Sequence, residues 1–235
     1  MQEYLGEFFG TLVLIVLGTS ASAGMTLKKA YGQGSGWLFV SFAWGMAVTF
    51  GVYTAAAFGA DGHLNPAVTL SLGLFSTFAK GKMLGYIIAQ LLGAFFGATL
   101  IILQFYPHFL ATKTVEEGNS VGIFATAPAI DNKYFNFLSE FITTFIFIFI
   151  MVNMGDFISG LKPLVVGFLI FSIGTGLGTT TGYALNPARD FMPRLAYTIL
   201  PVPHKSDANW SYAWIPVIAP IAGACLAVAL NGVLH

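Results

Sequence analysis

Two copies of the tripeptide Asn-Pro-Ala decide how this sequence is interpreted. The first lies in Gly62-His63-Leu64-Asn65-Pro66-Ala67-Val68-Thr69 and the second in Gly182-Tyr183-Ala184-Leu185-Asn186-Pro187-Ala188-Arg189-Asp190. Asparagine is a favoured N-cap and proline fits the first helical turn, so each copy predicts a helix that begins directly after the asparagine. The apolar segments around these starts, residues 64–79 and 184–198, are too short to cross a bilayer. Each predicts a re-entrant half-helix, which is tolerated at membrane depth only where protein or a wet cavity surrounds it.

The composition around these motifs is that of a membrane protein. Of the 235 residues, 56% are hydrophobic and only 9% are charged, whereas charged residues usually make up about a quarter of a water-soluble domain. The ten Lys and Arg residues balance the ten Asp and Glu residues. The chain therefore has no basic field that would attract nucleic acid, and we expect no nucleic-acid partner.

Stretches without Asp, Glu, Lys or Arg predict six membrane-spanning helices. With small extensions each supplies about 20 apolar residues, enough to cross roughly 30 Å of hydrocarbon. The fourth needs the longest extension, back through Glu140 to about Phe135. Because the stretches are continuously apolar rather than alternating, they favour helices over a barrel, and we expect an all-α, multi-pass protein of the cell membrane. They are residues 8–27, 30–60, 83–112, 141–155, 163–188 and 208–235.

The chain also repeats itself. Glu7-Phe8-Phe9-Gly10-Thr11 corresponds to Glu140-Phe141-Ile142-Thr143-Thr144, just as the two Asn-Pro-Ala motifs correspond to each other. Each half contains three spans and one half-helix, and an odd number of spans forces the halves into opposite orientations. We expect one domain over residues 1–235, an inverted repeat of about 1–106 and 134–235 joined across the surface by loop 107–133, with the half-helix N-termini meeting near the midplane.

These motifs resemble the major intrinsic protein family of aquaporins and glycerol facilitators over essentially the whole chain. Asp190 directly after Arg189 is similar to the glycerol-facilitator branch. The resemblance implies the aquaporin-like fold, a homotetramer with one pore per subunit, and no cofactor. It also implies a selectivity filter of Trp44, Gly174, Tyr183 and Arg189, in which the first three lie opposite the arginine. Gly174 stands where water-selective members usually carry histidine, which leaves room for a wider solute, and Tyr183 replaces the phenylalanine common in facilitators.

The chemistry of a pore also follows from the residues themselves. Two helix N-termini that point at one place concentrate partial positive charge there and repel cations. The side-chain NH2 groups of Asn65 and Asn186 can donate to a passing hydroxyl or water, which interrupts a proton-conducting chain of waters; this role is compatible with their role as caps. Arg189 offers five donors, so it can hold the hydroxyls of a neutral polyol while its charge excludes cations.

Mid-span carboxylates are costly unless their oxygens are satisfied. We expect Glu7 and Glu140 to accept hydrogen bonds from backbone N–H groups of the adjacent re-entrant loops, although a proton relay is the alternative. Asp190 and Arg194 are spaced i, i+4, which suits an ion pair.

Other residues have structural or backbone roles in this prediction. The two helix starts have structural roles, and the loops before them line the pore with unpaired carbonyls. The helix-start residues are Pro66, Ala67, Pro187 and Ala188, and the loop residues are Gly62, His63, Leu64, Gly182 and Ala184.

The function predicted from the sequence is passive diffusion of glycerol and other small uncharged solutes, with water, while ions and protons are excluded. No catalytic constellation or P-loop is visible, so we do not expect an enzyme. The four histidines show no ligand spacing, so no metal is expected. Two alternatives remain open: a water-selective aquaporin, and a proton-coupled secondary transporter that uses Glu7 and Glu140.

Overall fold

The structure is a computed structural model that describes residues 1–235, and all of its regular elements are helices. The α-helices are α1 (Gln2–Thr26), α2 (Trp37–Ala57), α3 (Pro66–Phe75), α4 (Met83–Gln104), α5 (Tyr106–Ala111), α6 (Val121–Phe124), α7 (Lys133–Asn153), α8 (Lys162–Thr175), α9 (Pro187–Ile199) and α10 (Ile215–Leu234). Two short 3-10 helices complete the set, η1 (Lys80–Lys82) and η2 (Leu177–Thr179).

Five of the six predicted spans are long, apolar helices: α1, α2, α4, α7 and α10 are each long enough to cross a membrane. The fourth span extends back past Glu140 to Lys133, as its composition requires. The fifth span differs, because α8 has 14 residues, about 21 Å at 1.5 Å per residue. It reaches further only by continuing through the turn into η2. The prediction of an all-α membrane protein is confirmed.

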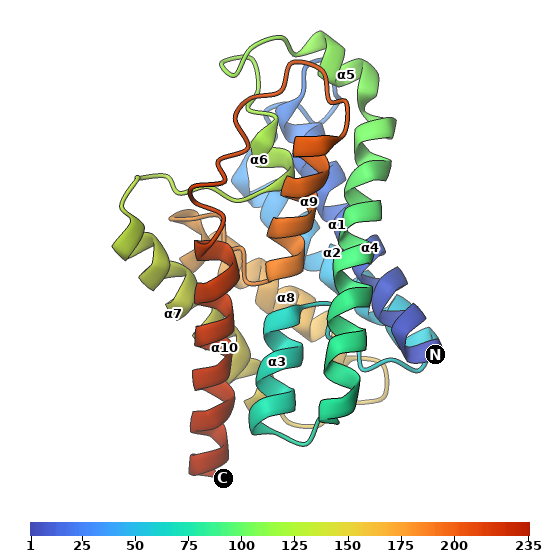
Figure 1. The fold of residues 1–235 in the computed structure, drawn as a ribbon, viewed down its shortest axis with the longest axis vertical. Helices are drawn as coiled ribbons and strands as arrows, with labels where there is room; N and C mark the ends of the chain where they lie inside the picture. The colour runs from blue at the N-terminus through green and yellow to red at the C-terminus, as the bar shows by residue number, and fades with distance from the viewer.

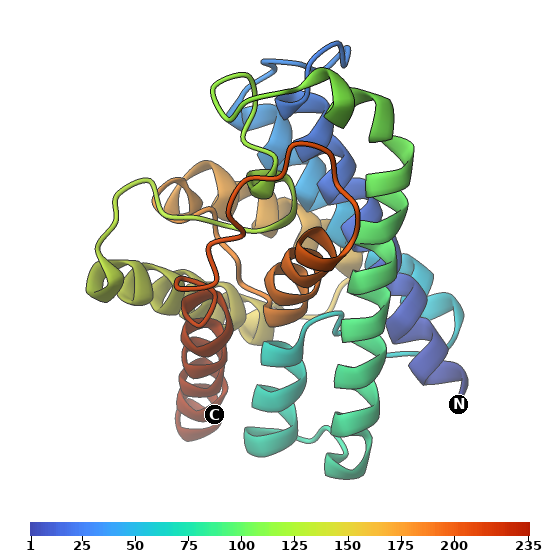
Figure 2. The same ribbon diagram turned by 45° about the horizontal axis from the view of Figure 1, so that its top comes forward.

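The two half-helices begin where the Asn-Pro-Ala motifs place them. The Asn65 side chain accepts a hydrogen bond from the backbone N–H of Ala67 at 2.8 Å, and Asn186 accepts one from Ala188 at 3.0 Å. A proline follows each cap in the first turn, where its missing N–H costs nothing. In Figures 1 and 2, α9 lies above α3 in the middle of the molecule, so two short helices occupy the depth that one span would cross.

Glycines let the helices of each half approach closely at matching places. A Cβ atom on Gly93 of α4 would overlap the Phe8 carbonyl of α1, and one on Gly223 of α10 would overlap the Phe141 carbonyl of α7. Each carbonyl belongs to the residue directly after a buried glutamate, so the packing repeats as the sequence does. In lipid, where the hydrophobic effect does not drive helices together, such close approach maximises packing contacts.

A second glycine contact joins the two halves. A Cβ atom on Gly45 of α2 would lie 2.5 Å from the Gly167 carbonyl of α8. Gly45 directly follows Trp44, so this contact fixes the part of α2 that carries the indole. The Thr49 hydroxyl also donates to the Pro163 carbonyl at 3.3 Å, one turn further along.

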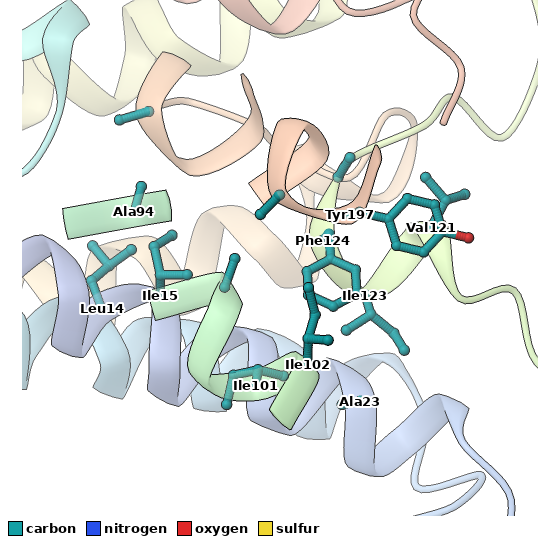
Figure 3. Close-up of a cluster of buried hydrophobic side chains, with 14 of the residues drawn as sticks. Leu14, Ile15, Ala23, Ala94, Ile101, Ile102, Val121, Ile123, Phe124 and Tyr197 are labelled. Atoms are coloured by element: carbon teal, nitrogen blue, oxygen red, sulfur yellow. The ribbon is translucent and has the colours of Figure 1, made fainter. Parts of the chain in front are cut away.

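The linker between the halves departs from the sequence prediction. Residues 107–133 were expected to cross the surface, yet they contain α5 and α6, and Val121, Ile123 and Phe124 are buried. Figure 3 shows these side chains beside Ile101, Ile102 and Tyr197 in one apolar cluster. The reason is that Tyr197, near the end of α9, has an apolar ring that packs against Phe124 of the linker. The linker thus buries this end of the half-helix.

The linker also defines one face of the molecule, here called the linker face. The opposite face, which carries both chain ends, is called the termini face (Figure 1). On the linker face, Lys28 after α1 forms an ion pair with Glu117. The hydrogen bond from Lys28 lowers the pKa of the Glu117 carboxyl, and the ion pair ties the linker to α1.

The glycine contacts predict that one methyl group will disturb the packing of α1 on α4. Gly93→Ala places a carbon against the Phe8 carbonyl and should destabilise the protein by about 1–3 kcal/mol, as overpacking does. The midpoint of thermal unfolding in detergent should fall. Gly24→Ala on α1 is the matched control, because a Cβ there meets nothing within 4 Å. An equal midpoint for the two variants would contradict this account of the packing.

Candidate solute channel

Two cavities enter the protein from opposite faces and meet at three side chains. The larger, about 630 Å³, extends from Asp61 and Lys162 at the termini face past both Asn-Pro-Ala asparagines. The smaller, about 270 Å³, lies below the linker. Trp44, Tyr183 and Arg189 line both cavities. The structure therefore brings three of the four predicted filter residues together at the place where one path narrows between two vestibules.

Arg189 lies over Trp44 rather than opposite it. Its guanidinium carbon is 4.0 Å from the centroid of the indole, a distance at which a cation is attracted to the ring face. The indole N–H donates to the Ser22 hydroxyl at 3.2 Å, which fixes the ring against α1. This corrects the expectation that Trp44 faces the arginine across the path.

The guanidinium of Arg189 keeps most of its hydrogen-bonding capacity. Of its five N–H donors, one reaches a protein acceptor, the Phe124 carbonyl at 3.4 Å. Since the side chain lines both cavities, the other donors are available to a solute in the path. Phe124 comes from the linker, so a segment expected on the surface helps to position the arginine.

Tyr183 occupies the room that Gly174 was expected to leave open. A Cβ atom on Gly174 would lie 2.8 Å from both Cζ and the hydroxyl oxygen of Tyr183, and one on Gly178 would overlap the same ring. Gly174 itself lines neither cavity. The missing side chain therefore makes space for an aromatic ring rather than directly for a solute, which corrects the sequence-based expectation.

The two Asn-Pro-Ala asparagines bind each other's loops. The Asn65 side-chain NH2 donates to the Leu185 carbonyl at 2.9 Å, and the Asn186 NH2 donates to the Leu64 carbonyl at 2.7 Å. The oxygen of each side chain caps its own half-helix. An amide NH2 has two donors, so each asparagine retains one N–H, and both side chains line the larger cavity.

Glu7 supports the first re-entrant loop through both carboxylate oxygens. One accepts the backbone N–H of His63 at 2.8 Å, and the other accepts that of Leu64 at 2.7 Å. The Gln90 side chain donates a further hydrogen bond at 2.7 Å. Leu64 has φ 51°, a left-handed conformation that costs energy for a residue with a side chain. The carboxylate is therefore part of what holds this strained turn.

Glu140 does the same for the second loop. Its oxygens accept the backbone N–H groups of Ala184 at 3.0 Å and Leu185 at 3.4 Å, and Leu185 has φ 56°. Neither Glu7 nor Glu140 lines either of these two cavities. This position supports a structural role for the two carboxylates. A proton relay through them would have no contact with the path.

The loops offer fewer free carbonyls than the sequence predicts. The Leu64 carbonyl is taken by Asn186, and the Ala184 carbonyl accepts the backbone N–H of Asn186 at 2.6 Å. No protein donor reaches the carbonyls of the other loop residues, which are Gly62, His63, Gly182 and Tyr183. The His63 ring contacts Thr69, with 3.1 Å between Nδ1 and the hydroxyl oxygen, so its side chain is held beside α3.

Asp190 and Arg194 form a fully buried ion pair on α9, with 2.7 Å between Oδ1 and Nη2. The other Asp190 oxygen accepts the backbone N–H and the hydroxyl of Thr126, each at 2.7 Å. Arg194 in turn donates to the Thr126 carbonyl at 3.0 Å and to the Ala208 carbonyl at 2.5 Å. A buried charge pair is stable only when its remaining groups are satisfied, and this network attaches the linker to the half-helix that carries Arg189.

Three supporting residues were not predicted from the sequence. Gln90 is a polar residue in the middle of an apolar stretch. In a membrane span such a residue usually has a functional or structural role, so it could have been singled out. Ser22 and Thr126 carry no such signal, because small hydroxyl residues are common in spans and loops. No group of three His, Cys, Asp or Glu side chains gathers as metal ligands.

Comparisons with known proteins agree with this geometry. The family described as "Major intrinsic protein" matches residues 1–230. "Glycerol uptake facilitator protein 2" of Lactiplantibacillus plantarum is 56% identical over 234 residues, covering 100% of both chains. "Probable glycerol uptake facilitator protein" of Thermotoga maritima is 44% identical and covers 98% of both.

Among solved structures, the aquaglyceroporin from Plasmodium falciparum superposes with a TM-score of 0.84 at 30% identity, covering 98% of this chain and 95% of the other. This agreement confirms the aquaporin-like fold, here with five apolar helices long enough to span a membrane and shorter helices between them. The chain belongs to the major intrinsic protein family of membrane channels.

Proposed function

We propose that this protein is a passive channel through which glycerol, other small uncharged solutes and water diffuse across the membrane. The observation that carries the proposal is the meeting of two cavities at Trp44, Tyr183 and Arg189. Relatives that carry the name glycerol uptake facilitator support glycerol as the solute. A channel of this kind is a transporter and performs no chemical reaction.

The constriction suits a small polyol because it has one apolar and one polar side. The Tyr183 ring offers apolar surface to a carbon backbone. Arg189 offers free N–H donors, and the carbonyls of Gly182 and Tyr183 have no protein donor. A polyol can thus exchange its hydration for these groups while its carbons contact the ring, which lowers the cost of leaving water.

Cations are disfavoured at two depths. At the constriction, Arg189 carries a fixed positive charge. Near the middle, the N-termini of α3 and α9 meet, each equivalent to about half an elementary charge. The free N–H groups of Asn65 and Asn186 turn a passing oxygen toward themselves, so a water at that place does not relay a proton.

A water-selective channel is the second candidate, because Tyr183 fills the space beside Gly174. A ring in that position narrows the path, and its width decides between water alone and glycerol with water. A proton-coupled transporter has no comparable support, since both buried glutamates lie away from the cavities.

Assembly and orientation complete the proposal. On the family resemblance we propose a homotetramer with one path per subunit and the termini face in the cytoplasm. The outward faces of the spans carry many exposed large apolar side chains, such as Leu38, Phe42 and Phe50 of α2. These faces are suited to lipid or to other subunits.

Gly174→His tests the constriction. The new side chain begins in space that the Tyr183 ring holds, so the ring should move into the path. Glycerol permeability of proteoliposomes, measured by stopped-flow light scattering, should fall about tenfold or more, equivalent to a barrier raised by ~1.4 kcal/mol. Water permeability should fall less, because water is smaller.

Gly176→His is the matched control, because a Cβ there meets only the Ser172 carbonyl at 3.6 Å. If both variants conduct glycerol equally well, the Tyr183 ring does not set the width. If the wild type conducts water but no glycerol, the chain is a water-selective channel.

Asn186→Asp tests the exclusion of protons and cations. A carboxylate keeps the capping oxygen but replaces the N–H donors with negative charge where the half-helices meet. Proton leak, followed with a pH-sensitive dye inside the vesicles, should rise about tenfold or more as the barrier falls by ~1.4 kcal/mol. Asn132→Asp makes the same change at the N-cap of α7, outside the cavities, and should leave the leak unchanged. Retained water flux with no added leak in Asn186→Asp would refute this role.

A further inference from the structure

The end of α8 leaves a carbonyl beside the constriction that the helix itself cannot satisfy. The last four carbonyls of a helix have no partner within it, and α8 ends at Thr175. The Gly174 carbonyl receives no backbone N–H from the turn that follows. It accepts instead the indole N–H of Trp37 at 2.7 Å. A side chain from the first residue of α2 thus caps a helix from the other half of the chain.

The Trp37 ring also packs against Tyr183. Their ring centroids are 5.8 Å apart, with an interplanar angle of 83°, which is the favoured edge-to-face arrangement. Trp37 lines the smaller cavity together with Tyr183 and Arg189. It therefore forms the wall of the linker-face vestibule directly beside the ring that narrows the path.

Packing holds the Tyr183 ring on two sides. Its buried hydroxyl forms no hydrogen bond of good geometry, although the Ser41 side chain lies beside it. Its backbone has φ 39°, a conformation that side-chain-bearing residues rarely adopt without support. Gly174 and Gly178 bound the ring on the α8 side, and Trp37 contacts it beside the vestibule. Without Trp37, the ring has open space toward the linker face.

We propose that Trp37 is a positioning residue that sets the solute size limit of the channel. It keeps Tyr183 in the niche beside Gly174, and it satisfies the Gly174 carbonyl that the end of α8 leaves without a backbone partner. The proposal rests on the proposed function, since it assigns a size limit to a glycerol-conducting path. Trp37 is 40% exposed and belongs to none of the buried apolar clusters, so its removal takes no side chain out of the core.

The test compares two substitutions by a ratio of permeabilities. Trp37→Ala removes the ring and the N–H, whereas Trp37→Phe removes the N–H and shortens the ring system but retains an aromatic edge. The full-length protein is reconstituted in proteoliposomes, and stopped-flow light scattering gives permeability to glycerol and to xylitol, a five-carbon polyol. Once the permeability of empty liposomes is subtracted, the ratio for one preparation does not depend on how much channel is folded.

The xylitol-to-glycerol ratio should rise about two- to tenfold in Trp37→Ala, the range expected when one edge-to-face contact is lost. Trp37→Phe should give a smaller rise, because it loses the hydrogen bond but keeps an aromatic ring that can pack against Tyr183.

Trp210 provides the matched control. It is 38% exposed, also packs edge to face, with Phe191 at 5.4 Å, and donates its indole N–H to the Thr198 hydroxyl at 3.1 Å. It contacts none of the filter residues and lines neither cavity. Trp210→Ala and Trp210→Phe should therefore keep the wild-type ratio even if they reduce the amount of folded protein.

The outcomes separate this proposal from the proposed function. Wild-type glycerol flux no greater than that of empty liposomes overturns both. Wild-type glycerol flux with an unchanged ratio in the Trp37 variants overturns the positioning role alone. A ratio that rises equally in the Trp37 and Trp210 variants also overturns it, because the effect would then be general loosening. If Trp37→Ala does not fold, the rise predicted for Trp37→Phe still decides.

Discussion

The rest of the structure depends on the pair of hydrogen bonds that cross between the Asn-Pro-Ala loops. Asn65 donates to the Leu185 carbonyl, and Asn186 donates to the Leu64 carbonyl. The side-chain oxygen of each asparagine caps its own half-helix, so one side chain serves both halves. Because backbone groups at membrane depth cannot turn to lipid for partners, two broken helices can meet inside the protein only if each satisfies the other. These hydrogen bonds also fix the positions of Asn65 and Asn186, which line the larger cavity.

The two re-entrant loops are held by different side chains, although the halves of the chain repeat each other. Gln90 lies three residues before the contacting Gly93 and donates to Glu7. The residue three before the contacting Gly223 is Pro220, which has no N–H and no polar side chain. The second loop has instead the buried network of Asp190, Arg194 and the linker. The half that carries the filter arginine is therefore held from the linker side, where the constriction lies.

Sequence patterns predicted those parts of the molecule that local chemistry decides. Charge-free stretches predicted the spans, and the Asn-Pro pairs predicted both half-helix starts. The spacing of Asp190 and Arg194 predicted their ion pair. Local patterns did not predict the burial of residues 121–124 or the position of Arg189 over the Trp44 ring. Both depend on contacts between segments far apart in the chain, and a short apolar run in a linker looks the same whether it is buried or exposed.

The same limit applies to selectivity, and Gly174 shows why. An absent side chain suggests a wide path, but a neighbouring side chain can fill the space that it leaves. Here Tyr183 takes that space, while Gly174 lines neither cavity. In the proposed channel, Tyr183 sets the width of the path, and its position depends on the residues that pack against it. Specificity in this channel is therefore a property of the contacts around the constriction, since interiors are packed closely enough that one ring cannot move alone.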